Sequence, residues 1–242
     1  MKMSVKFYNM NVISLLGMIW KALTEKDPQF AELFPDYDEY HKVSRISPLS
    51  ILRASLISEW IKPNSSVLDV GCGEGFLMEY LLKKKNCKVF GIDVSRKAIE
   101  IVRSKGMEGE VRDIDEEGLG LSKDEKYDYI LFVEVLEHLK YPHKILIEAS
   151  KHVNEGVIVT LPNSGYIYWR LQMLRGYFPR QSFMHLHFWS INDFYIFLRQ
   201  LGLRPISLKT ELPTKGFKGL LLNHLKNLLA YQQCWLIAPV KD

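Results

Sequence analysis

The chain has 242 residues, 47% of them hydrophobic and 25% charged, which is typical of a globular protein with one sizeable core. Its formal net charge of +4 is too small to indicate a nucleic-acid partner on its own. The three cysteines, Cys72, Cys87 and Cys234, have no paired spacing, so the sequence argues against a disulfide framework or a zinc finger and favours a cytoplasmic location.

Residues 1–62 are expected to form an N-terminal helical segment ahead of a main domain that spans 63–242. The apolar stretch from Val12 to Leu23 is interrupted by Lys21 and is shorter than the roughly 20 residues that cross a bilayer, so no transmembrane segment is predicted. An amphipathic helix fits it better, either packed on the domain, closing over it as a lid, or touching a membrane surface. A second helix is expected from Leu49 to Ile61, before Pro63.

From Ser66 onwards, short apolar runs alternate with amphipathic ones, which predicts strands alternating with helices. We expect strands at 66–70, 88–93, 109–112, 127–133, 156–161, 206–209 and 234–238, and helices at 75–84, 96–105, 143–152 and 191–201. This order favours an α/β fold of the Rossmann-like, doubly wound type, because each parallel connection needs a crossover. An insertion that contains a helix is expected at about 162–190.

The stretch VLDVGCGEG, from Val67 to Gly75, joins the first strand to its helix. Gly71, Gly73 and Gly75 lack a Cβ, which lets backbone amides approach a ligand closely and permits positive φ. Asp93 ends the next strand 20 residues beyond Gly73, where an acid can accept both hydroxyls of a ribose. The pattern therefore predicts an adenosine compound beyond the carboxyl ends of these strands.

In these motifs the chain resembles the class I S-adenosylmethionine-dependent methyltransferases, of the methyltransferase type 11-like kind. The resemblance covers about residues 64–205 and rests on VLDVGCGEG, VFGIDVS, VRDIDEEGL and YDYILFVEVLEHL. It implies a mostly parallel seven-stranded sheet with an antiparallel last strand, and S-adenosylmethionine as cofactor. The implied cofactor residues are Asp69, Gly71, Cys72, Gly73 and Gly75 at the methionine end, Asp93 and Val94 at the ribose, Asp113 and Ile114 at the adenine, and Glu134 beside the sulfonium.

Two other interpretations stay open for these residues. A nicotinamide dehydrogenase also has a glycine loop and a ribose acid, but its pyrophosphate favours a further glycine where this chain has Leu77 or Met78. Taken singly, each residue also has a structural explanation: the glycines can serve a tight turn, and Asp93 can cap the helix that starts near Ser95. The joint spacing is what favours a cofactor site.

The run from Glu134 to His138, EVLEH, is the candidate for chemistry at the acceptor. A helical turn after the fourth strand would place Glu134, Glu137 and His138 on one side, at three- and four-residue spacing. Glu137 and His138 are the predicted catalytic residues, with His138 as a base for the acceptor. The run also looks like the ExxEH of ubiquinone-type O-methyltransferases and small-RNA 2′-O-methyltransferases. That resemblance implies a divalent cation held by Glu134, Glu137, His138 and His187; the alternative is a turn without metal.

A narrower resemblance, to the MetW-type methionine-biosynthesis proteins, covers about residues 91–205. It rests on VTLPNSGYIYWRLQMLRGYFP and HLHFWSINDF, with a Pro-Asn pair after the fifth strand and a His-x-x-Ser before an Asp-Phe helix. At VEVLEHL the chain departs from that family, which lacks the glutamate-histidine pair. The resemblance implies a MetW-like relative but no role in the methionine pathway.

The 162–190 segment is expected to form the rim of the acceptor pocket. Tyr166 and Trp169 offer stacking surface, and Asn163 and His187 flank them. Arginines that offer bidentate anion recognition are Arg170, Arg175 and Arg180. The alternative is packing, because Ile167, Leu171, Leu174 and Phe178 recur at helical spacing, which favours a helix packed on the sheet.

Charge is unevenly distributed along the chain. Residues 151–242 carry 11 Lys or Arg against 4 Asp or Glu, so this part is basic by 7 charges.

The expected function is methyl transfer to a small-molecule acceptor, at oxygen. The basic final third leaves an RNA 2′-O-methyltransferase open, and the MetW resemblance leaves open a cofactor-binding regulatory partner of a biosynthetic enzyme. A homodimer is compatible with each of these roles.

Overall fold

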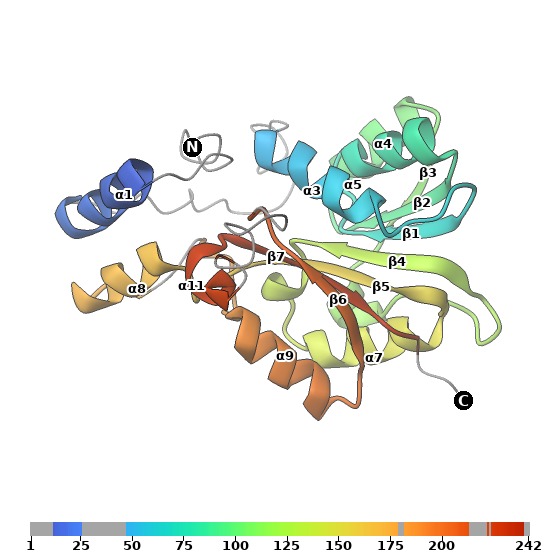
Figure 1. Cartoon of the computed structure of the whole chain (residues 1–242). Coiled ribbons are helices and arrows are strands. Elements are labelled where there is room, and N and C mark those ends of the chain that lie inside the picture. Colours follow the sequence, from blue (N-terminus) through green and yellow to red (C-terminus); the bar gives the residue numbers. More distant parts are fainter. Residues whose placement is uncertain (1–11, 26–46, 179–181, 213–221, 223, 240–242) are drawn as a thin grey trace.

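The computed structural model describes residues 12–25, 47–178, 182–212, 222 and 224–239. Its centre is one seven-stranded sheet in the order β3-β2-β1-β4-β5-β7-β6 (Figure 1). The strands are β1 Ser66–Val70, β2 Lys88–Asp93, β3 Glu108–Val111, β4 Tyr127–Val133, β5 Val153–Pro162, β6 Pro205–Lys209 and β7 Gln232–Ile237. Within this sheet β7 runs antiparallel to both of its neighbours, β5 and β6, and the pairs among β1 to β5 are parallel. The predicted fold class is confirmed.

Helices cover both faces of the sheet, because alternate strand residues point to opposite sides. On β1, Val67 packs toward one face and Leu68 toward the other. The face of Val67 carries α3 (Pro48–Ser58), α4 (Phe76–Lys85) and α5 (Arg96–Ser104), and the face of Leu68 carries α7 (Pro142–Lys151) and α9 (Ile191–Gln200) (Figure 1). The central strands are therefore apolar on both sides, which explains their nearly continuous hydrophobic runs.

Two further helices pack on one another beside these layers. α1 (Val12–Thr24) and α8 (Ile167–Leu174) share a cluster of buried side chains: Met18, Ala22, Tyr166, Tyr168 and Trp169. Arg175 links the pair, since its Nη1 donates to the carbonyl oxygen of Ala22 at 2.9 Å, near the C-terminal end of α1. The helix expected over 12–23 is confirmed, and it packs on the 162–190 insertion.

The side chains of α8 do not point as they would if Ile167, Leu171, Leu174 and Phe178 packed on the sheet. Leu174 is 81% exposed and Phe178 54%, whereas Tyr168 and Trp169 are buried against α1. Helical spacing identified the helix but not its partner, because α8 packs on another helix and not mainly on the sheet. Arg180 lies outside the described residues.

Other elements differ from prediction where the backbone is left-handed. The helix expected from Gly75 begins at Phe76, because Gly75 has φ 78° and is the N-cap. The helical turn predicted over Glu134–His138 is wrong: Glu134 has φ 59°, and only Leu136–His138 form a single 3-10 turn. The short helices α6 (Ile114–Glu117) and α11 (Lys226–Leu229) were not predicted, because four residues show no periodicity.

Among the helices that the structure describes, none is both long enough and apolar enough to span a bilayer.

Candidate active site

The glycine loop after β1 is held against the end of β2. The backbone amides of Gly71 and Cys72 donate to the carbonyl oxygen of Ile92 at 2.7 and 3.1 Å, and that of Gly73 donates to Oδ2 of Asp93 at 2.8 Å. Gly71 has φ 73°, and a Cβ there would lie 2.3 Å from Cγ2 of Val135. Glycine is therefore required both by the backbone and by the neighbouring turn.

Two buried carboxylates flank this loop. Asp69 is 1% exposed, and in the described part of the chain its Oδ2 has no hydrogen-bond partner. Burial, and then the charge of Asp93, raise the pKa of Asp69 to about 7. Asp93 accepts the amide of Ser95 on Oδ1 at 2.8 Å as well as that of Gly73 on Oδ2. The structure thus brings the acid at the tip of β2 to the glycine loop, and the N-cap of α5 is Ser95 itself.

The remaining predicted cofactor residues lie around the same edge of the sheet. Val94 is 43% exposed, directly after β2. Asp113 is exposed and caps α6, with its Oδ1 accepting the amide of Asp115 at 3.0 Å. Ile114 is 8% exposed and belongs to the core. The thiol of Cys72 is buried, which raises its pKa, so it is no reactive thiolate.

Glu134 directly follows β4 in a left-handed conformation, and its side chain contacts three other elements. Its Oε1 accepts the Thr160 hydroxyl of β5 at 3.1 Å, and its Oε2 accepts the Gln232 amide of β7 at 3.2 Å. Nη1 of Arg53, from α3, lies 2.9 Å from Oε2. Sequence reasoning missed Arg53, because a single arginine on an amphipathic helix carries no signal of its partner.

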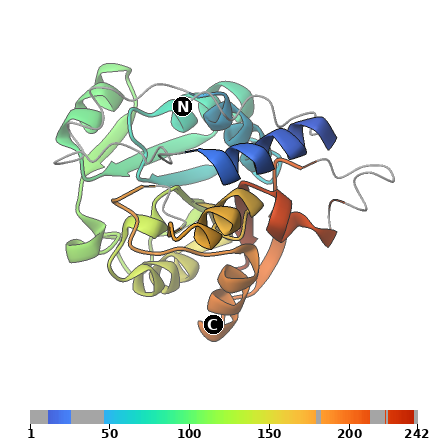
Figure 2. The same ribbon diagram turned by 90° about the vertical axis from the view of Figure 1, so that its left-hand side faces the viewer.

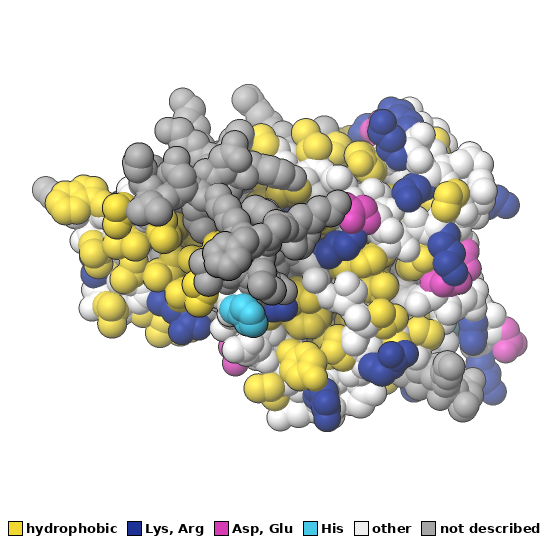
Figure 3. Space-filling model, in the orientation of Figure 1, with side chains coloured by type: hydrophobic (Ala, Val, Ile, Leu, Met, Phe, Trp, Pro, Cys, Tyr) yellow, Lys and Arg dark blue, Asp and Glu magenta, His cyan; other side chains and the backbone are white. Residues whose placement is uncertain are grey.

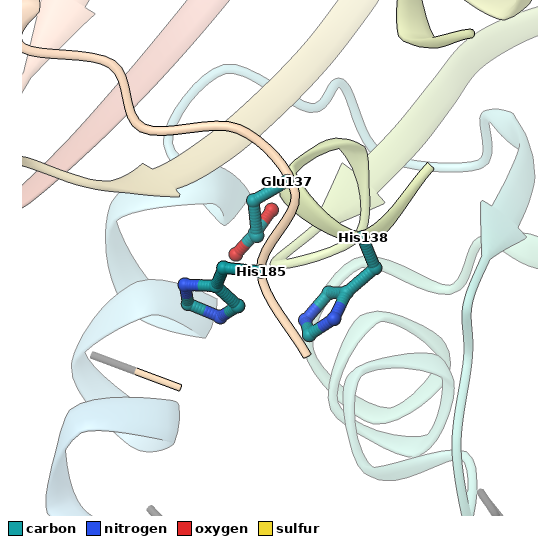
Figure 4. Close-up of side chains that lie close together, drawn as sticks. All are labelled: Glu137, His138 and His185. Atoms are coloured by element: carbon teal, nitrogen blue, oxygen red, sulfur yellow. The ribbon is translucent and has the colours of Figure 1, made fainter. Parts of the chain in front are cut away.

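Glu137, His138 and His185 form a compact cluster beyond the carboxyl end of β4 (Figure 4). One potential ligand atom from each lies within 4.8 Å of the others. Glu137 is 1% exposed, and neither of its carboxylate oxygens has a hydrogen-bond partner within the described segments. The two imidazole rings meet edge to face, with centroids 4.7 Å apart. A buried carboxylate beside two half-buried imidazoles suits proton transfer or cation binding.

Burial sets the protonation of this cluster. It raises the pKa of Glu137 well above the ordinary value, and the nearby charge of Glu134 adds to that rise. Burial lowers the pKa of His138, and it lowers that of His185 to about 3, with His138 contributing. Nδ1 of His138 lies 3.2 Å from the carbonyl oxygen of Met184, which can only accept, so this nitrogen carries the proton and the lone pair is on Nε2.

The predicted cation ligands need correction at two positions. Glu134 does not join the cluster, because its left-handed backbone turns its side chain toward Arg53. His187 does not join either: its ring stacks on Trp189, with centroids 5.0 Å apart, and its Nε2 donates to the carbonyl oxygen of Leu139 at 2.9 Å. His185, two residues earlier in HLH, takes that place. The sequence prediction named His187 and not His185, because spacing along the chain does not show which histidine of HLH lies beside Glu137.

Most predicted acceptor residues have partners within the fold. The side chain of Asn163 is fully buried and bonded to the backbone of Gly165, Asn227 and Ala230. Tyr166 and Trp169 are buried in the α1–α8 contact, and Nε of Arg170 donates to the carbonyl oxygen of Gly165 at 2.7 Å. The structure therefore gives these four side chains scaffold contacts, and an acceptor role for them stays a prediction.

A small pocket opens beside the cluster. It is lined by Glu137, Leu161, Pro162, Ser164, His185, His187, Phe188 and Trp189. Of the predicted acceptor residues, His187 is the one in this lining. The segment after Phe183 closes over the 3-10 turn, because the amides of Leu186 and His187 both donate to the carbonyl oxygen of Glu137, at 2.7 and 3.2 Å.

Comparisons with known proteins agree with this architecture. The family model described as methionine biosynthesis protein MetW matches residues 53–236. A curated relative, the ubiquinone biosynthesis O-methyltransferase of Hydrogenovibrio crunogenus, is 28% identical over 179 residues, which is 69% of this chain and 74% of the relative. The solved structures of S-adenosylmethionine-dependent methyltransferases from Archaeoglobus fulgidus and Aquifex aeolicus superpose with TM-scores of 0.60 and 0.58, at 18% and 21% identity. They cover 84% and 86% of this chain, and 98% and 100% of the two solved chains. The chain belongs to the MetW family, and its fold is that of the S-adenosylmethionine-dependent methyltransferases.

Proposed function

We propose that the protein transfers the methyl group of S-adenosylmethionine to an oxygen atom of a small-molecule acceptor. The observation that carries this proposal is the cluster of buried Glu137 with half-buried His138 and His185. Glu137 and His138 follow β4, which is adjacent to β1, the strand before the glycine loop. The name of the O-methyltransferase relative supports oxygen as the acceptor atom.

The residues around the glycine loop fit S-adenosylmethionine, which supplies a methyl group on a positively charged sulfur when bound. Asp69 supports this fit, since its buried Oδ2 has no hydrogen-bond partner among the described residues and calls for a donor or a cation. We assign it the methionine end, together with the backbone from Gly71 to Gly75. Asp93 with Val94 is assigned to the ribose, Asp113 with Ile114 to the adenine side, and Glu134 to the sulfonium side.

A hydroxyl acceptor must lose its proton as the new bond from oxygen to carbon forms. His138 suits this step, because burial lowers its pKa and keeps the ring neutral, with the lone pair on Nε2. His138 is therefore assigned as the base that takes the acceptor's proton. Glu137 and His185 lie beside it and line the small pocket, which we assign to the part of the acceptor that bears the hydroxyl.

Asp93→Ala is expected to weaken binding of S-adenosylmethionine and of its demethylated product by about 1–3 kcal/mol. The substitution removes the proposed hydrogen bonds to the ribose hydroxyls. It also removes the acceptor for the Gly73 amide, a hydrogen bond that holds the glycine loop. Titration calorimetry on both variants measures the change, with Asp124→Ala, an exposed acid, as the control. An unchanged affinity in Asp93→Ala would reject the ribose assignment, and no heat with the wild type would reject the cofactor.

The alternative to His138 as base is a divalent cation held by Glu137, His138 and His185, because a lone pair that binds the cation cannot also take the acceptor's proton. The donor set fits such a cation, because two imidazoles and a carboxylate that accepts no hydrogen bond from the described residues are usual ligands of Mn²⁺ or Zn²⁺. Such a cation would lower the pKa of an acceptor hydroxyl bound to it.

Titration with Mn²⁺ separates this cation site from one built around Glu134. Glu137→Gln is expected to lose the binding heat, because it removes the charged ligand, whereas Glu134→Gln keeps it. The absence of any metal-dependent heat in the wild type would remove the cation from the proposal and leave the base in place.

A further inference from the structure

An exposed apolar surface runs over α1 and α8. It consists of Leu16, Trp20 and Leu23 from α1, and Met173, Leu174 and Phe178 from α8 and the residues just after it, and is called here the α1–α8 patch. Each of these side chains is at least 46% exposed, with Trp20 at 71% and Leu174 at 81%. Large apolar side chains gathered in this way indicate a contact with something outside the described structure.

The patch is built on the outward side of a packed pair of helices. Leu16, Trp20 and Leu23 are four and three residues apart, so they form one stripe of α1, while Met18 and Ala22 on the other stripe pack against α8. Figure 2 shows α1 and α8 side by side on the flank of the molecule, and Figure 3 shows hydrophobic side chains gathered over that end. The buried stripe already accounts for folding of α1, so the exposed one is available to another surface.

The chain segments that carry the patch are basic and free of acids. Residues 1–24 contain no Asp or Glu and have Lys2, Lys6 and Lys21. Residues 156–192 also contain no Asp or Glu, and they have Arg170, Arg175 and Arg180. The first acid after α1 is Glu25, whose carboxylate accepts a hydrogen bond from the Tyr168 hydroxyl and forms an ion pair with Lys21. Apolar side chains including a tryptophan, set in acid-free basic segments, are typical of helices that lie at a membrane surface.

We propose that the α1–α8 patch docks the protein on an anionic lipid surface. A second copy of the chain is the less suitable occupant, because a symmetric contact would bring two sets of like charges together. Anionic headgroups complement the same charges, and each lysine or arginine near such a surface adds to the attraction. The pocket lies close by along the chain, because Ser164 lines it and α8 begins at Ile167. Docking is independent of the proposed methyl transfer.

Flotation with vesicles tests the docking. The full-length protein is expected to bind vesicles of phosphatidylcholine mixed with phosphatidylglycerol, and to bind less as salt is raised. Trp20→Ser with Leu174→Ser is expected to lower the partition coefficient roughly a hundredfold, about tenfold for each apolar side chain. Both side chains are mostly exposed, so the melting temperature should not move.

Ile196→Ser is the matched control, because Ile196 is 53% exposed on α9, away from the patch. The control is expected to bind like the wild type. Three results would overturn the proposal: no binding by the wild type, an equal loss in Ile196→Ser, or a concentration-dependent dimer in sedimentation that the double substitution abolishes.

Discussion

His138→Ala is expected to lower kcat for methyl transfer by about a hundredfold to ten-thousandfold, the range in which a positioned base contributes. The affinity for S-adenosylmethionine should stay unchanged, since His138 contacts the loop at Met184 and not the glycine loop. Transfer of labelled methyl groups to a pool of hydroxylated metabolites measures the rate, and calorimetry measures the affinity. The split between kcat and binding separates a loss of chemistry from a loss of folding.

His152→Ala is the matched control, because His152 lies at the far end of α7 with its Nδ1 bonded to the carbonyl oxygen of Glu125. It should keep the wild-type rate. If His138→Ala also kept that rate, the proton would have to leave by another route, and the assignment of His138 as base would fail.

Asp69→Asn is expected to flatten the pH dependence of folding in the absence of cofactor. The carboxyl of Asp69 has a pKa of 3.8 when unfolded and about 7 when folded, because it is buried beside Asp93. The folded state therefore binds more protons between these values, so stability falls as pH rises from about 4 to about 7. The free energy lost across this window is at most about 4 kcal/mol, from roughly three pKa units.

Urea unfolding at pH 4 and pH 8 measures this effect as a difference between variants, which cancels the other titrating groups. Asp69→Asn should be close to the wild type at pH 4 and more stable than it at pH 8. Asp124→Asn, at an exposed position, should follow the wild type throughout. Parallel curves for Asp69→Asn and the wild type would mean that this carboxyl does not hold its proton in the folded state.

The glycine loop and its acid could be predicted because both depend on local order along the chain. A strand, a bend without side chains and a second strand place Asp93 near Gly73 whenever the two strands are parallel neighbours. The positions that failed depend on single backbone angles or on distant segments. Glu134 has a left-handed backbone and so lies outside the predicted helical turn, and residue spacing cannot predict a single backbone angle.

Distant segments account for the rest. Arg53 reaches Glu134 from a helix about 80 residues earlier, and His185 reaches Glu137 from a loop nearly 50 residues later. The sequence predicted Tyr166 and Trp169 at the rim of the acceptor pocket, but both are buried because α1 packs over them. The alternation of strands and helices fixes where a segment lies along the sheet, but not which side chains it meets beyond the sheet.

The contact between Gly71 and Val135 limits which substitutions this site can accept. The bends after β1 and β4 share one small volume, since an added methyl group at position 71 would overlap a methyl group of Val135. A smaller residue at position 135 would make room for a Cβ at position 71, but the positive φ of 73° there would still disfavour any residue other than glycine. A substitution at either bend therefore changes which residues the other bend tolerates, so the two bends are expected to evolve together.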